Sequence, residues 1–163
     1  MTAQTMQIGN RPCRIYGEAH AEYLLLQMTG KHELQSMESE ATTIAQSAHR
    51  FLFAAIPVES WNDELSPWKS PAVWGKQGFG GNAADTLRFL TEQVIPTLKQ
   101  QFELSEIVKI ILGGYSLAGL FALWASTQTD LFYGVAAASP SVWFPGWMWS
   151  LNSGTRYRRS TFI

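Results

Sequence analysis

The chain has 163 residues, the length of one ordinary domain, of which 46% are hydrophobic, 13% aromatic and 15% charged, with a net charge of -1. This composition excludes a disordered chain, and so small a net charge gives no field that would attract nucleic acid or an anionic membrane surface. We therefore expect a single domain over residues 1–163 and a small neutral molecule as its ligand.

The number of cysteines and the N-terminal residues indicate the cellular compartment of the protein. Cys13 is the only cysteine, which excludes an intramolecular disulfide, and residues 1–12 lack the apolar run of a secretory signal. No stretch has the roughly 20 apolar residues that span a bilayer. These features predict a cytoplasmic protein with no membrane partner.

The first half of the chain alternates strand and helix patterns. Residues 13–16 and the apolar run 23–28 predict strands, and residues 33–48 carry apolar side chains at helical spacing. Residues 51–56, FLFAAI, predict a buried strand that Pro57 is expected to end, because proline has no N–H for the ladder.

Residues 58–81 are rich in Gly, Pro and Trp and predict a long loop. Four aromatic residues in it either line an acyl pocket or pack the loop onto the domain; they are Trp61, Trp68, Trp74 and Phe79. A helix should follow, capped by Asn82 and kinked at Pro96.

Residues 107–112 (IVKIIL) and 133–138 (YGVAAA) predict two further buried strands, separated by GGYSLAG and the apolar segment LFALWA. Strands that alternate with helices predict a mostly parallel sheet covered on both faces. Ser139 and Ser141 follow the second strand and are interpreted as turn residues. Residues 147–163 show no period and predict an irregular tail, so we expect a fold that lacks its C-terminal strands.

Ser116 lies at the centre of the chemically informative motif. In GGYSLAG it stands between a strand and a helix, with Gly114 two residues before it and Ala118 two residues after it. A sharp strand-to-helix turn brings two backbones together and needs small residues, a role that Gly114, Ala118 and Gly119 suit. The turn points the serine hydroxyl outward and leaves the Leu117 N–H for an oxyanion, which predicts a nucleophile.

The segments IILGGYSLAGLFALWA, GVAAASPSVWF and PVESWNDELSPW resemble the esterase family of α/β-hydrolases that includes enterochelin-esterase-like enzymes. The resemblance implies an α/β-hydrolase fold, carboxylic ester hydrolysis through an acyl-Ser116 intermediate, and no metal or organic cofactor. It also implies a second oxyanion N–H from the loop after FLFAAIP, near Val58 or Glu59.

The acid and histidine that the resemblance implies should follow Ser116, but no histidine follows it and Asp130 is the only later carboxylate side chain. His20, His32 and His49 precede it and are interpreted as solvated or capping residues. Because a serine without its base is a poor nucleophile, we expect a C-terminally truncated hydrolase domain with little activity.

Two alternatives stay open: a non-catalytic small-molecule binding module, and an enzyme completed by a partner chain. Aromatic residues near the end of the chain should be exposed and favour self-association. They are Trp143, Trp147 and Trp149.

Overall fold

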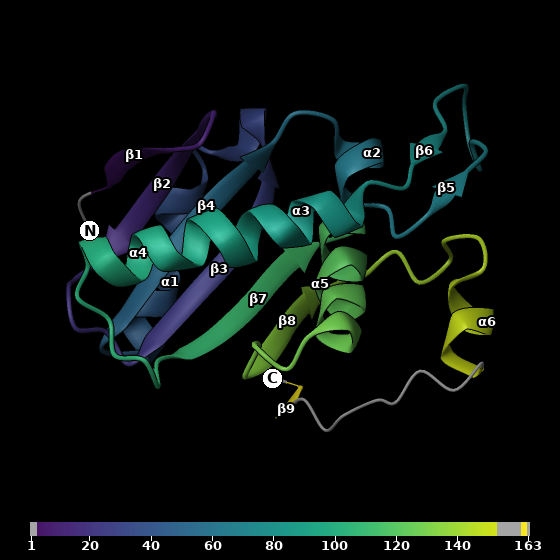
Figure 1. Cartoon of the computed structure of the whole chain (residues 1–163). Coiled ribbons are helices and arrows are strands. Elements are labelled where there is room, and N and C mark those ends of the chain that lie inside the picture. The colour runs from purple at the N-terminus through teal and green to yellow at the C-terminus, as the bar shows by residue number, and fades with distance from the viewer. Residues whose placement is uncertain (1–2, 153–160, 163) are drawn as a thin grey trace.

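The computed structural model describes residues 3–152, 161 and 162. A seven-stranded sheet in the order β1-β2-β4-β3-β7-β8-β9 forms the centre of the molecule (Figure 1). Its strands are β1 Gln4–Ile8, β2 Arg11–Gly17, β3 Tyr23–Gly30, β4 Phe51–Val58, β7 Lys109–Tyr115, β8 Gly134–Ala138 and β9 Thr161–Phe162. The first of these, β1, has no counterpart among the strands predicted from sequence.

The two N-terminal strands pair antiparallel, β1 with β2 and β2 with β4. All other pairs in this sheet are parallel: β3 with β4, β3 with β7, β7 with β8 and β8 with β9. The predicted mostly parallel sheet is therefore confirmed. The carboxyl ends of β3, β4 and β7 consequently meet at one edge, where parallel α/β sheets place their sites.

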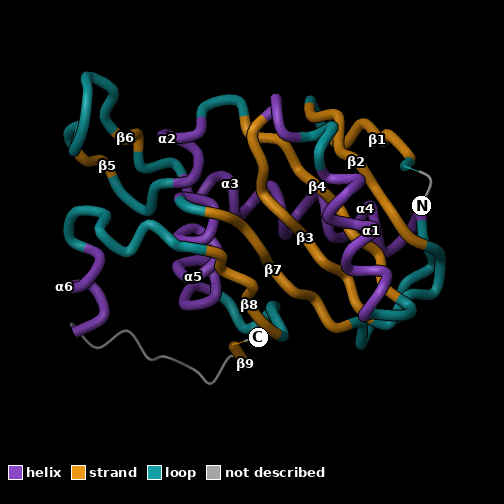
Figure 2. Tube along the Cα trace, turned by 180° about the vertical axis from the view of Figure 1, so that it is seen from behind, coloured by secondary structure: helices purple, strands orange, loops and turns teal. Residues whose placement is uncertain are grey.

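Helices cover both faces of the sheet. Helix α1 lies on one face, and α3, α4 and α5 lie on the other (Figures 1 and 2). The helices are η1 Lys31–Glu33, α1 Met37–Ser47, α2 Trp61–Leu65, α3 Ala83–Phe89, η2 Leu90–Val94, α4 Ile95–Gln101, α5 Leu117–Gln128 and α6 Trp147–Asn152. None of the helices in the described part of the chain is long and apolar enough to cross a membrane.

Strand β4 divides the core into two, because every one of its side chains is buried. Leu52, Ala54 and Ile56 join the larger cluster, which includes buried residues of α5. Phe51 and Phe53 alternate with them and join a smaller cluster that includes residues of α1. Burial on both faces explains why this strand is apolar at every position rather than at every second one.

Pro57 does not end β4, contrary to the prediction: the strand continues to Val58, and Pro57 pairs with Thr29 of β3. The β2–β4 ladder ends earlier, at the pair Arg14 and Ala55. The Pro57 carbonyl accepts a hydrogen bond from Nη1 of Arg11, 3.1 Å away, instead of from a ladder N–H. Proline is tolerated here because its missing N–H is not needed by a neighbouring strand.

The predicted long loop is also more structured than expected. It contains α2 and a two-stranded sheet formed by β5 Lys69–Ser70 and β6 Phe79–Gly80. Asn82 occupies the N-cap position of α3 but makes no side-chain capping bond. In place of a simple kink at Pro96, the π-helical turn η2 ends two residues before the proline, which stands in the first turn of α4.

The prediction of an irregular tail over residues 147–163 is wrong in part. Trp147–Asn152 forms helix α6, and Thr161–Phe162 forms β9, which pairs in parallel with β8. Trp147 is buried, contrary to the exposure expected from sequence, whereas Trp143 and Trp149 are exposed as expected. The packing of Trp147 against the core supports a helix that the sequence period did not reveal. Residues 153–160 and 163 lie outside the described residues.

Candidate active site

Ser116 forms the turn between β7 and α5, at the carboxyl edge of the sheet. Its backbone angles are φ 56° and ψ -119°, a conformation that non-glycine residues rarely adopt. Two backbone bonds hold the turn. The Ser116 N–H donates to the carbonyl of Ala138 at 3.0 Å, and the Ser116 carbonyl accepts from the N–H of Leu120 at 3.1 Å.

The small residues around Ser116 lie together as the turn requires. A Cβ added to Gly114 would lie 2.5 Å from the carbonyl carbon of Ala118. A Cβ added to Gly119 would lie 3.0 Å from the Gly114 carbonyl oxygen and 3.2 Å from the Cα of Pro140. The start of α5 is therefore pressed against β7 on one side and against the loop after β8 on the other.

Leu117 is the first residue of α5, a helix of 12 residues. Its side chain is buried, which fixes the direction of the first turn. The first N–H groups of a helix have no partner within it and lie at the positive end of the helix dipole. The Leu117 amide is thus placed beside Ser116 where it can donate to an anion.

Ser141 is a close partner of Ser116 that the sequence interpretation missed. Its Oγ lies 3.1 Å from Ser116 Oγ, and its N–H donates to the Ser116 carbonyl at 3.0 Å. Ser141 is 1% exposed, whereas Ser139 is exposed and has a positive φ of 43°. Only Ser139 therefore fits the predicted role of a solvent-facing turn residue.

Val58 ends β4 and is in register with Gly30 of β3. Since β3 lies between β4 and β7, the axes of β4 and β7 are about 10 Å apart. The N–H groups of Glu59 and Ser60, which follow Val58, both donate to Oε1 of Glu64, at 2.7 and 2.8 Å. The structure thus leaves Val58 two strands from Ser116, and the amide of Glu59 already has an acceptor.

The end of β3 lies nearer to Ser116 along the sheet. Gln27 pairs with Gly113, and Gly30 and Ser116 each lie three residues further on. Lys31 begins the short helix η1, and its ammonium forms an ion pair with Oε2 of Glu59. This pair joins the loops that leave β3 and β4 at the carboxyl edge.

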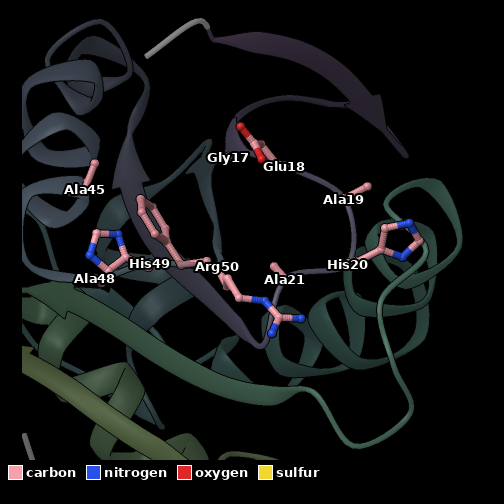
Figure 3. Close-up of a pocket in the computed structure, with 10 residues that line it drawn as sticks. Gly17, Glu18, Ala19, His20, Ala21, Ala45, Ala48, His49 and Arg50 are labelled. Carbon is pink, nitrogen blue, oxygen red and sulfur yellow. The ribbon is translucent and has the colours of Figure 1, made fainter.

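Two of the three histidines lie at the opposite edge of the sheet. His20 and His49 line a cavity of about 380 Å³ formed by the turns that precede β3 and β4 (Figure 3). His20 lies 3.2 Å from Oε2 of Glu103. Because β7 has 7 residues, this edge is roughly 20 Å from the turn at Ser116.

His32 is the histidine at the same edge as Ser116. It is exposed and belongs to η1, directly after β3. The described residues contain no group of three or more His, Cys, Asp or Glu side chains that could hold a metal ion.

Trp61 is partly buried and packs against the larger core cluster. The other aromatic residues of the loop form two groups, which adjoin where the ring centroids of Phe79 and Trp143 lie 6.3 Å apart. Trp68 and Phe79 pack against Phe144 with ring centroids 5.5 and 5.1 Å apart, and Phe79 is buried. Trp74 and Trp143 are 68% and 46% exposed and meet edge to face, with centroids 4.5 Å apart. The first group fastens the loop to the domain, and the second forms an exposed aromatic pair.

A cavity of about 440 Å³ lies beside the end of β7. It is lined by Gln27, Glu40, Gly114, Tyr115, Ala136, Ala137 and Ala138. Nε2 of Gln27 donates to Oε2 of Glu40 at 2.9 Å, so one polar pair lies among mostly small side chains. Tyr115, which immediately precedes Ser116, is 61% exposed.

Comparison with known proteins gave a family and a set of similar folds. The sequence matches the family described as "Putative esterase" over residues 25–161. No match was found among curated proteins. An IroE-like serine hydrolase from Shewanella oneidensis superposes with a TM-score of 0.79 at 18% identity, over 93% of this chain and 55% of that one.

Two further solved structures share the fold. The siderophore hydrolase EstA from Aspergillus nidulans has a TM-score of 0.69 at 20% identity, over 99% of this chain and 66% of that one. The BES protein from Bacillus cereus has a TM-score of 0.62 at 17% identity, over 93% and 69%. The chain thus spans between about half and two thirds of the length of these proteins.

Proposed function

The chain belongs to the "Putative esterase" family, and on that basis we propose that it carries the nucleophile of a serine hydrolase acting on carboxylic esters. The observation that carries the proposal is the turn at Ser116. A serine with positive φ stands between a parallel strand and the first residue of a helix, and the contact of Gly114 with Ala118 closes the turn.

In the proposed reaction, Ser116 Oγ attacks the ester carbonyl carbon and its proton passes to a base. The negative charge that develops on the carbonyl oxygen accepts a hydrogen bond from the Leu117 N–H. The alcohol then leaves with a proton, and water hydrolyses the acyl-Ser116 ester to release the carboxylic acid. Each step needs a proton carrier, and Ser116 cannot supply it alone.

A second oxyanion donor is needed beside Leu117. The sequence predicts Val58 or Glu59 as this donor, but both lie at the end of β4, two strands from β7, and the Glu59 N–H already donates to Glu64. The loop after β3 is the better candidate, because β3 adjoins β7 and Lys31 is the first residue of a short helix. We therefore place the second donor at Lys31 rather than at Val58.

The general base is the weakest part of the site. No histidine follows Ser116 in the sequence, and His20 and His49 lie at the far edge of the sheet. We therefore expect this chain alone to hydrolyse esters very slowly, since loss of the base from a related triad costs about 10⁶-fold in kcat. The alternative function is a small-molecule binding module that uses the cavity beside Tyr115.

Labelling with a fluorophosphonate probe tests the proposal. We expect slow labelling at Ser116 that accelerates when free imidazole is added as an external base and disappears in Ser116→Ala. The control Ser139→Ala, in an exposed turn, should label like the unaltered chain. Labelling at another residue, or none at Ser116 even with imidazole, would reject the hydrolase and leave the binding module. Fast labelling without imidazole that is lost in His32→Ala would identify His32 as the base.

A further inference from the structure

In the part of the chain that the structure describes, the hydroxyl of Ser141 has one hydrogen-bond partner, the hydroxyl of Ser116. The two oxygens lie 3.1 Å apart, and either can be the donor. Ser141 is 1% exposed, so water does not compete for its hydroxyl. Within the described part of the chain, neither hydroxyl has another hydrogen-bond partner.

The backbone, not the hydroxyl, sets the position of Ser141. Its N–H donates to the Ser116 carbonyl at 3.0 Å, and its carbonyl accepts from the N–H of Phe144 at 3.0 Å. The preceding residue, Pro140, lies against Gly119 in the first turn of α5. These contacts do not involve the Ser141 side chain, so a substitution there leaves the loop in place and removes only the hydroxyl.

Burial couples the two side chains. If the Ser116 side chain rotated away, the Ser141 hydroxyl would be left buried without a partner, which is unfavourable. The side-chain conformation of Ser116 is therefore stabilised by a group 25 residues further along the chain.

The direction of the bond follows from the chemistry. A nucleophilic serine must release its hydroxyl hydrogen to a base, so Ser116 cannot at the same time donate that hydrogen to Ser141. The arrangement is compatible with attack only when Ser141 is the donor and a lone pair of Ser116 Oγ is the acceptor. In that direction the bond also stabilises negative charge that develops on Ser116 Oγ.

We propose that Ser141 is a positioning residue for Ser116, donating a hydrogen bond to Oγ that holds the nucleophile's side chain and leaves its proton free for a base. The inference rests on the proposed function. It adds a residue from the loop after β8 to a site otherwise built from the ends of β3 and β7.

The test uses Ser116→Cys, because a thiol at this position titrates without any ester turnover. The rate of alkylation by iodoacetamide is measured against pH, and the modified peptide is identified by mass spectrometry so that Cys13 is not counted. When Ser141→Ala is added, the pKa of the introduced thiol should rise by about one unit, since the thiolate loses a donor. Ser141→Thr in place of Ser141→Ala keeps a hydroxyl, so the thiol pKa should stay close to that of the Ser116→Cys chain with Ser141 intact.

Ser139→Ala in the same Ser116→Cys chain is the matched control and should leave the thiol titration unchanged. An unchanged pKa with Ser141→Ala, or an equal shift with Ser139→Ala, would overturn the positioning role. Circular dichroism of each variant verifies that it is folded. Phosphonate labelling of the unaltered Ser116 reports separately on the hydrolase function. A thiol shift without labelling would thus reject the function alone, and labelling without a shift would reject the role of Ser141 alone.

Discussion

Gly114 lies in direct contact with Ala118 across the turn at Ser116. A Cβ added to Gly114 would stand 2.5 Å from the Ala118 carbonyl carbon and 2.6 Å from its Cβ, distances that real Cβ atoms do not show. At the adjacent Gly113, an added Cβ would meet nothing closer than 3.4 Å. Two neighbouring glycines therefore have different functions, and only Gly114 sets how closely the helix approaches the strand.

Gly114→Ala should destabilise the protein by at least about 2 kcal/mol, because the new methyl group must push α5 away from β7 or distort the turn. Gly113→Ala should change stability by less than about 1 kcal/mol and serves as the control. Urea denaturation followed by circular dichroism measures both. Equal losses for the two variants would contradict a tight contact at Gly114.

Glu64 links three segments at the carboxyl edge. Its Oε1 accepts hydrogen bonds from the N–H groups of Glu59 and Ser60, and its Oε2 lies 2.6 Å from Nη2 of Arg11. The Arg11 guanidinium also lies over the ring of Phe89, 4.6 Å from its centroid. Both partners of the ion pair are mostly buried, with side chains 13% and 15% exposed.

Glu64→Ala should therefore cost about 3 kcal/mol of unfolding free energy, since it leaves a mostly buried guanidinium without its charge partner and two amides without an acceptor. Glu64→Gln keeps an acceptor for the amides and should cost less. The pair of Lys99 and Glu106 offers a comparison, because the Glu106 side chain is 91% exposed, and Glu106→Gln should cost under about 1 kcal/mol. If the substitutions at Glu64 and at Glu106 caused similar losses of unfolding free energy in urea denaturation, the linking role of Glu64 would be wrong.

The sheet could be predicted from sequence because its buried parallel strands are continuous apolar runs. Residues 51–56 and 107–112 show this pattern, and the glycine spacing around Ser116 marks the turn between strand and helix. These are local signals, carried by residues close together in the chain. The fold class and the candidate nucleophile could therefore be predicted from the sequence.

The parts that could not be predicted depend on contacts between distant residues. Pro57 continues β4 because the β2 ladder has already ended there, which no local pattern shows. Ser141 contacts Ser116 from 25 residues away. The Glu59 N–H, a backbone donor expected to be free for an oxyanion, donates a hydrogen bond to the carboxylate of Glu64. Each of these findings depends on the register of strands or the path of a loop, which the local sequence does not contain.

The exposed aromatic pair of Trp74 and Trp143 predicts self-association. Their rings meet edge to face, and Val142 beside them is 44% exposed, so apolar surface is continuous there. Sedimentation velocity should show a weight-average mass that rises with protein concentration. The double variant Trp74→Ser with Trp143→Ser should remove most of that rise. Ile107→Ser is the control, because Ile107 is 88% exposed but lies elsewhere in the chain. An equal effect of the control would contradict an interface at the tryptophan pair.

Cys13 is fully buried in β2, and its burial raises the pKa of the thiol to about 11, against an ordinary value of 9.0, with the charge of Arg11 acting in the opposite direction. Well below pH 9 the thiol is protonated in both the folded and the unfolded chain and does not affect the pH dependence of stability. Between about pH 9 and 11 the unfolded chain releases this proton and the folded chain keeps it. The free energy of unfolding must therefore fall over this interval.

Comparison with Cys13→Ala isolates this effect, because lysine and tyrosine titrations in the same interval are common to both proteins. The difference in unfolding free energy, unaltered chain minus variant, should be constant up to about pH 8.5 and should then decrease by about 2 to 3 kcal/mol by pH 11. Urea denaturation at half-unit steps of pH measures it. A difference that stays constant through pH 11 would mean that the folded thiol ionises as readily as the unfolded one, and that the site at Cys13 is open to water.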